Sequence, residues 1–303
     1  RAIEIASDMS RRRVAVLYGF NTIGAVTGVV LATFFMLEIF GARITLWIAC
    51  LINILIGLAA RSMSRSGSLK EAPEKDTERM HIHAGQPAEG SVPAAFVFAA
   101  AGIVGFAFML MELVWYRMLG PLLGGSTYTF GLILAVALLG IGLGGAAYAL
   151  RSQTSPPRLH AFALTCGMEA LFMAVPYALG DRLAVLAALL RPLGQIGFTG
   201  HVIGWFLVTG LVVLPAAVVS GYQFPLLIGL LGRGRENIGQ HIGLTYAWNT
   251  GGAIIGSLAG GFLLLPFLTA PGSWKGVVLL LILAGISAGF YSFRHERRKG
   301  FLI

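Results

Sequence analysis

The sequence predicts an all-α integral membrane protein with about eight transmembrane helices. Hydrophobic residues make up 56% of the 303 residues, charged residues make up only 12%, and the mean hydropathy is +0.80. A soluble protein of this composition would lack the polar surface that it must present to water. The chain also contains uniformly apolar windows of the roughly 20 residues that a helix needs to cross a bilayer, rather than the short alternating strands of a membrane barrel.

Eight such windows occur, and each is expected to form one transmembrane helix. They cover residues 14–40, 43–61, 94–118, 126–150, 160–180, 197–230, 243–268 and 274–293. The segment Asp181–Pro192 is amphipathic, and we expect it to lie along the outer membrane surface.

The windows divide the chain into four parts. Residues 1–61 contain the first two helices, and residues 94–293 contain six. Between them, residues 62–93 mix Ser, Gly, Pro, Glu and Lys, which indicates a flexible cytoplasmic linker. Residues 294–303 form a basic cytoplasmic tail.

The basic residues predict the orientation in the membrane. The formal net charge is +9, but 17 of the 22 Lys and Arg fall on one side when the loops alternate between two sides. This bias follows the positive-inside rule, which places both ends of the sequence and the linker in the cytoplasm. The expected location is a bacterial-type inner (plasma) membrane. Because the charge has this explanation, it does not indicate nucleic-acid binding.

A similar 11-residue segment with a central Asn-Thr pair, here called the Asn-Thr phrase, occurs twice. The copies are YGFNTIGAVTG at residues 18–28 and YAWNTGGAIIG at residues 246–256. Both copies follow a basic loop and precede a second apolar window, so they belong to two-helix units of the same orientation. Parallel repeats of this kind relate the two six-helix halves of major facilitator transporters. We therefore expect a major-facilitator-like six-plus-six architecture whose first four helices are missing from this sequence. A native eight-helix protein is the alternative.

Each copy of the phrase carries an Asn-Thr pair beside glycines at GxxxG spacing. Such glycines let two helix backbones approach closely, and the polar pair can form hydrogen bonds across that contact. The alternative is that the pair lines a substrate path between the halves. The residues concerned are Asn21, Thr22, Asn249 and Thr250.

Polar residues inside the apolar windows are candidates for function, because charged groups are costly in a bilayer. Glu169 lies about nine residues into its window, near the midplane. It either binds a cation or a proton, or it is a structural residue bonded to a neighbouring helix. Gln223 lies between Gly221 and Pro225, where we expect the helix to break. Freed carbonyl groups there would line a path, and a simple kink is the alternative.

A second candidate lies near the outer interface. Glu112, Trp115 and Tyr116 have the i, i+3 and i+4 spacing of one helix face. A carboxylate beside two aromatic rings can accept an organic cation through ion pairing and cation–π attraction. The alternative is a pair of interfacial aromatic residues beside a solvated carboxylate.

Several motifs occur in the order found in a known family. LMELVWYRMLGPLLGGSTYTFGLILAVALLGIGLGG, at residues 110–145, has an acidic residue, Trp and Arg before a Gly-Ser-Thr-Tyr turn and a glycine-rich helix. It resembles the opening helices of the membrane domain of fused transporter/spermidine synthase proteins, the membrane-bound polyamine aminopropyltransferase family. The resemblance continues in CGMEALFMAVPYAL at 166–179, in VLPAAVVSGYQFPLL at 213–227 and in both Asn-Thr phrases.

The resemblance implies a transporter-like membrane domain without aminopropyltransferase activity. In that family, catalysis resides in a soluble Rossmann-like domain that binds decarboxylated S-adenosylmethionine through a glycine-rich loop. Here the run GIGLGG, at residues 140–145, lies inside an apolar window rather than after a strand. We therefore expect no enzyme activity from this chain itself; the alternative is a membrane domain that anchors a synthase domain of a longer parent protein.

Neither a metal site nor a cofactor is expected. Cys50 and Cys166 lie inside apolar windows without metal-ligand spacing, so we interpret them as small packing residues. His81 and His83 lack a third ligand nearby in the sequence.

Two functions fit these features. The first is transport of a small organic cation such as a polyamine. The substrate-binding candidates are Glu169, Glu112, Trp115, Tyr116 and Gln223. The second is a non-transporting structural or anchoring subunit of a larger membrane complex. The lipid bilayer is the expected partner in both cases, and other membrane subunits are expected in the second.

Overall fold

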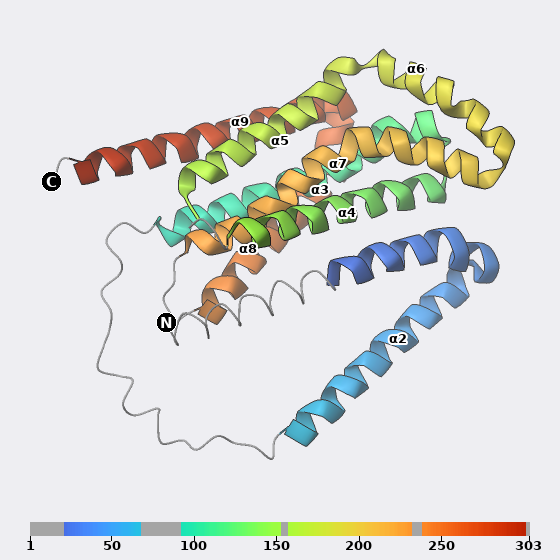
Figure 1. Ribbon diagram of the computed structural model, residues 1–303, viewed down its shortest axis with the longest axis horizontal. Helices are drawn as coiled ribbons and strands as arrows, with labels where there is room; N and C mark the ends of the chain where they lie inside the picture. Colours follow the sequence, from blue (N-terminus) through green and yellow to red (C-terminus); the bar gives the residue numbers. More distant parts are fainter. Residues whose placement is uncertain (1–20, 68–91, 153–156, 232–237, 301–303) are drawn as a thin grey trace. The chain divides into compact units, whose positions relative to one another are not determined.

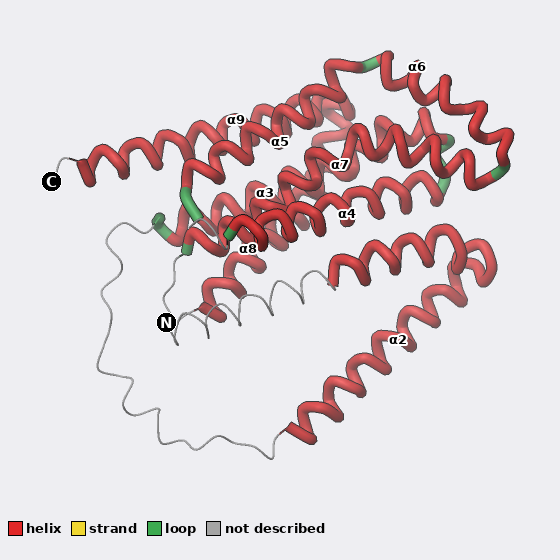
Figure 2. The backbone as a smooth tube through the Cα atoms, in the orientation of Figure 1, coloured by secondary structure: helices red, strands yellow, loops and turns green. Residues whose placement is uncertain are grey.

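The computed structural model describes residues 21–67, 92–152, 157–231 and 238–300 (Figure 1). Within these ranges the secondary structure consists of helices joined by short loops, without a strand (Figure 2). Six helices in these ranges are long and apolar enough to cross a membrane: Asn21–Met63, Ala94–Leu123, Thr127–Arg151, Leu159–Leu179, Phe198–Leu230 and Ile242–Arg294. The prediction of an all-α, multi-pass membrane protein is confirmed at this level.

Two of these helices contain a residue with a non-helical backbone. The 43-residue helix has Gly41 at φ 69° and ψ 172°, and the 53-residue helix has Thr269 at φ 64° and ψ 174°. Each of these long helices takes up two of the eight predicted windows, whereas the other four windows correspond to one helix each. In the described part of the chain, six long helices cover the eight predicted windows because the helical backbone resumes directly after each kink.

The chain divides into two compact units, one of residues 1–30 and 92–303 and one of residues 31–91. In the smaller unit, a π-helical turn, η1 (Ala32–Met36), leads into α2 (Leu37–Gly67). Gly41 has the positive φ that residues with a side chain rarely adopt, and the helix kinks at this residue. Helix α2 extends into the predicted linker, and residues 68–91 of that linker lie outside the described residues.

The larger unit contains most of the helices. They are α3 (Ala94–Leu123), α4 (Thr127–Arg151), α5 (Leu159–Leu179), α6 (Asp181–Leu190), the 3₁₀ turn η3 (Arg191–Ile196), α7 (Phe198–Leu230), α8 (Ile238–Ala259), the π-helical turn η4 (Gly260–Leu264) and α9 (Leu265–Gly300). Local signals explain several boundaries. Helix α3 ends at the left-handed Gly124, and the Ser126 side chain caps α4 by accepting a hydrogen bond from the Thr129 backbone N–H. The amphipathic segment 181–192 forms α6 and the start of η3, between α5 and α7 (Figure 1).

Glycines allow close contact in two helix pairs. Between α3 and α8, a Cβ added at Gly252 would overlap the backbone of Gly102. Between α4 and α7, a Cβ added at Gly144 would overlap the backbone of Val218. The run of residues 140–145 lies entirely within α4, so its glycines serve helix packing instead of forming a nucleotide-binding loop after a strand.

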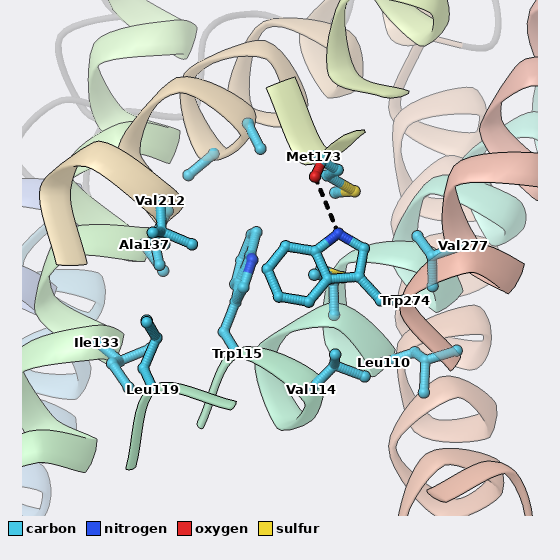
Figure 3. Packing of buried hydrophobic residues seen from close by; sticks show 14 of the residues in the cluster. Leu110, Val114, Trp115, Leu119, Ile133, Ala137, Met173, Val212, Trp274 and Val277 are labelled. Carbon is cyan, nitrogen blue, oxygen red and sulfur yellow. Dashed lines mark hydrogen bonds between the residues drawn. The ribbon is translucent and has the colours of Figure 1, made fainter. Parts of the chain in front are cut away.

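An apolar cluster joins α3, α4, α5, α7 and α9 in the larger unit (Figure 3). The indole of Trp115 is fully buried in this cluster. The Trp274 Nε1–H donates a hydrogen bond of 3.0 Å to the Met173 carbonyl oxygen, which ties α9 to α5 (Figure 3). A second buried cluster, around Phe162 and Leu227, joins the start of α5 to the end of α7.

Candidate functional site

Glu169 is buried in the middle of α5, with 1% of its surface exposed. It lies ten residues after Leu159, the first residue of the helix, which is about 15 Å along the helix axis and half of the roughly 30 Å hydrocarbon core. Among the described residues, neither carboxyl oxygen has a hydrogen bond of good geometry, and the Gln223 side chain is the polar group that interacts with the carboxyl. Because buried polar groups are nearly always hydrogen-bonded, this exception marks Glu169 as a candidate for binding.

Gln223 on α7 approaches the same part of α5. Its amide Nε2 lies 3.9 Å from the Cys166 Sγ, which is a long contact to a weak acceptor. Cys166 and Glu169 are three residues apart on α5 and therefore share a helix face. Gln223 is fully buried, and its Oε1 lacks a partner within the described part of the chain. The α5–α7 contact thus places a carboxyl, a thiol and an amide together inside an apolar interior.

The helix that carries Gln223 does not break at the predicted place. Helix α7 is continuous from Phe198 to Leu230, through both Pro215 and Pro225. Proline is tolerated in transmembrane helices because neighbouring helices and local adjustments satisfy the carbonyl groups that it frees. Gln223 is therefore presented by a continuous helix, and the expectation of broken backbone at this site is wrong for the described chain.

The predicted cluster on α3 is divided between different surroundings. The Trp115 ring packs edge-to-face on Phe108, with 6.1 Å between ring centroids, inside the apolar cluster of Figure 3. The Tyr116 ring packs edge-to-face on Phe130 of α4, with 5.4 Å between centroids. Glu112 is half-buried. The two rings are held by different neighbours because helices surround α3 on more than one side.

The two Asn-Thr pairs also differ in their surroundings. Asn249 Nδ2 donates a hydrogen bond of 3.0 Å to the Ala101 carbonyl oxygen, across the close contact of α8 with α3. Its neighbour Thr250 is exposed. In the first copy, Asn21 is exposed and Thr22 is buried.

Cys166 is the neighbour of the candidate site that sequence reasoning did not assign to it. The available signal was its position three residues before an acidic residue in an apolar window. His81 and His83 lie outside the described residues. Within the described part of the chain, no group of three or more His, Cys, Asp or Glu side chains is placed to hold a metal ion.

No protein-family profile, curated protein or solved structure matches this chain. What the helices show is a multi-pass membrane protein. The functional argument therefore begins from the buried polar residues of α5 and α7.

Proposed function

We propose that this membrane protein is transporter-like and moves a small organic cation such as a polyamine, with Glu169 as the cation-binding group. The observation that carries the proposal is the Glu169 carboxyl group, buried at mid-depth beside the neutral Gln223 and, among the described residues, without a hydrogen bond of good geometry. An ionisable residue at this depth is costly unless a charge partner or a proton accompanies it. A protonated amine supplies both a charge and hydrogen-bond donors, and such pairs are strong in a dry site.

The candidates on α3 have a different place in this proposal. Glu112 and Tyr116 are half-buried and meet the cation nearer the outer surface, in the orientation that the positive-inside rule predicts. Trp115 packs behind them in the apolar cluster. Since Glu169 is closely packed, the cation reaches it when α5 and α7 separate, as expected for alternating access.

The proposal includes a parallel internal repeat and eight membrane crossings. The π-helical turns begin at Ala32 and at Gly260, which is 228 positions later, and the kinks at Gly41 and Thr269 are also 228 positions apart. The repeated sequence phrase has the same offset. Because π-helical turns are rare, a shared turn and kink in one register supports two copies of a helix–kink–helix unit. Each kink then separates two crossings, in a repeat of the kind found in the family that the sequence resembles.

Uptake of radiolabelled spermidine into liposomes containing the purified protein tests this function. Glu169→Gln preserves the shape of the side chain and removes its charge, so we expect uptake to fall at least about tenfold, as for the loss of one buried charge-assisted contact. Glu38→Gln is the matched control, since Glu38 is exposed. Uptake that is equal in Glu169→Gln and wild type would refute the site, and no uptake by the wild type would refute transport.

A second candidate function is a non-transporting subunit that holds another membrane helix. Gly24 and Gly28 are the counterparts of Gly252 and Gly256, which pack on α3. Among the described residues, nothing lies within 4 Å of a Cβ built at Gly24 or Gly28. This open glycine face favours a helical partner.

Purification from native membranes distinguishes the two functions. A subunit that depends on this face co-purifies with the wild type and is lost in Gly28→Leu. Gly57→Leu is the control, because Gly57 also has open space but lies in the other helical segment. Equal recovery of the subunit in both variants would rule out the glycine face as its binding surface.

A further inference from the structure

A cavity of about 110 Å³ lies where α4 ends and α5 begins, beside α7. Three basic side chains line it, Arg151 from α4, Arg158 from the residue before α5, and His160 from the first turn of α5, and all three are exposed. Among the lining residues that the structure describes, none is Asp or Glu. The volume is several times the roughly 10–15 Å³ that one water molecule needs, so the cavity has room for a polyatomic group.

The inner wall of this cavity is aromatic and apolar. Tyr148 of α4 and Tyr222 of α7 meet edge-to-face with 5.3 Å between ring centroids. Leu226, one helical turn after Tyr222, is buried and belongs to the apolar cluster around Phe162. The cavity is therefore cationic at its mouth and apolar at its base, an arrangement that suits a charged group attached to an apolar chain.

The start of α5 adds to the attraction for an anion. The N-cap residue Arg158 makes no side-chain capping hydrogen bond, and Ala161 N–H bonds to the Arg158 carbonyl oxygen at 3.1 Å. The first N–H groups of a helix lack intrahelical acceptors and carry the positive end of the helix dipole. A helix N-terminus flanked by basic side chains binds phosphate readily.

We propose that this cavity binds a phosphate group, presented either by the headgroup of an anionic phospholipid or by soluble phosphate. Arg151 and Arg158 are the charged ligands, and arginine matches phosphate oxygens through paired N–H donors. Both arginines lie at the ends of transmembrane helices, on the side that the charge distribution assigns to the cytoplasm. Basic pockets between helices on that side are suited to anionic lipid headgroups.

Native mass spectrometry of the full chain, purified in detergent, tests the site. The probes are phosphatidylglycerol, phosphatidylcholine of the same acyl length, and inorganic phosphate as a competitor. We expect phosphatidylglycerol to be retained over phosphatidylcholine, and we expect Arg151→Gln and Arg158→Gln each to weaken its binding about fivefold. Arg182→Gln and Arg191→Gln are matched controls, because these arginines are exposed beyond the opposite end of α5.

The outcomes separate the two sources of phosphate. Selective retention of phosphatidylglycerol that inorganic phosphate does not displace assigns the site to a lipid. Protection against thermal unfolding by inorganic phosphate, lost in Arg158→Gln and without lipid selectivity, assigns it to soluble phosphate. Equal retention of both lipids together with no effect of phosphate would overturn the proposal. An Arg151→Lys, Arg158→Lys variant controls for folding, because it keeps the charge and loses only the paired N–H donors, so we expect it to bind more tightly than the Gln variants and less tightly than the wild type.

Discussion

Replacing Gly252 with Ala should destabilise the contact between α3 and α8. The added Cβ would lie 2.7 Å from the Gly102 carbonyl carbon and 2.8 Å from its Cα, whereas ordinary contacts begin at 3.4 Å. The obstructing atoms belong to the backbone and cannot rotate away. The two helices must therefore separate by at least about 0.7 Å at this point, because the Gly102 carbonyl oxygen lies closer still.

The magnitude follows from this displacement. The Asn249–Ala101 hydrogen bond, 3.0 Å long, would lengthen to about 3.7 Å or more, beyond hydrogen-bonding distance. Overpacking costs about 1–3 kcal/mol and the lost interhelical bond about 0.6 kcal/mol, while Ala in place of Gly favours the helix by about 0.8–1 kcal/mol. The expected net loss of stability is about 1–3 kcal/mol.

Intrinsic fluorescence during heating measures this change, because Trp115 and Trp274 are buried reporters of the helix bundle. Gly251→Ala is the matched control, since nothing among the described residues lies within 4 Å of a Cβ at Gly251. We expect Gly252→Ala to lower the unfolding temperature by several degrees at a fixed heating rate, and Gly251→Ala to leave it unchanged or raise it. Equal midpoints for the two variants would refute the close contact.

Two further predictions concern the kinks and the buried indole. Both kinked positions have backbone angles that are essentially restricted to glycine. Gly41→Ala should therefore destabilise the protein by about 1–3 kcal/mol, and Thr269→Gly should stabilise it by about 1 kcal/mol. Unfolding midpoints that move in the opposite directions would contradict this. Trp274→Phe should cost about 1–3 kcal/mol through loss of its bond to Met173 and of packed ring volume, whereas Trp47→Phe, at an exposed site, should change the midpoint little.

Much of the helical architecture could be predicted from the sequence. The apolar windows at 94–118, 126–150, 160–180 and 197–230 each correspond to one helix of the structure, because the bilayer imposes a length that composition alone reveals. The long helices that contain Gly41 and Thr269 were less predictable. A window counts apolar residues, but it does not register whether the hydrogen-bonded backbone continues across a single kinked residue.

The candidate site was predictable in its residues and not in its arrangement. Glu169 and Gln223 stand out as polar side chains in apolar windows, but their proximity depends on how α5 packs on α7. The sequence indicates only a packing role for Cys166, because a cysteine in an apolar window is ordinarily a packing residue. Trp115 shares a helix face with Glu112 by spacing alone, and the surrounding helices then enclose its ring in the apolar cluster.

The sequence by itself determined the class of this protein, the positions of its apolar helices and the polar residues that are costly inside a bilayer, because these follow from composition and helix geometry. Only the tertiary structure decided which polar groups have partners. The two Asn-Thr phrases show the difference, since Asn249 bonds to the Ala101 carbonyl oxygen on α3 and Asn21 is exposed. The same Asn-Thr pair acquires different surroundings in the two segments, because a hydrogen bond between helices requires a second helix at the correct distance, and that helix belongs to another part of the chain.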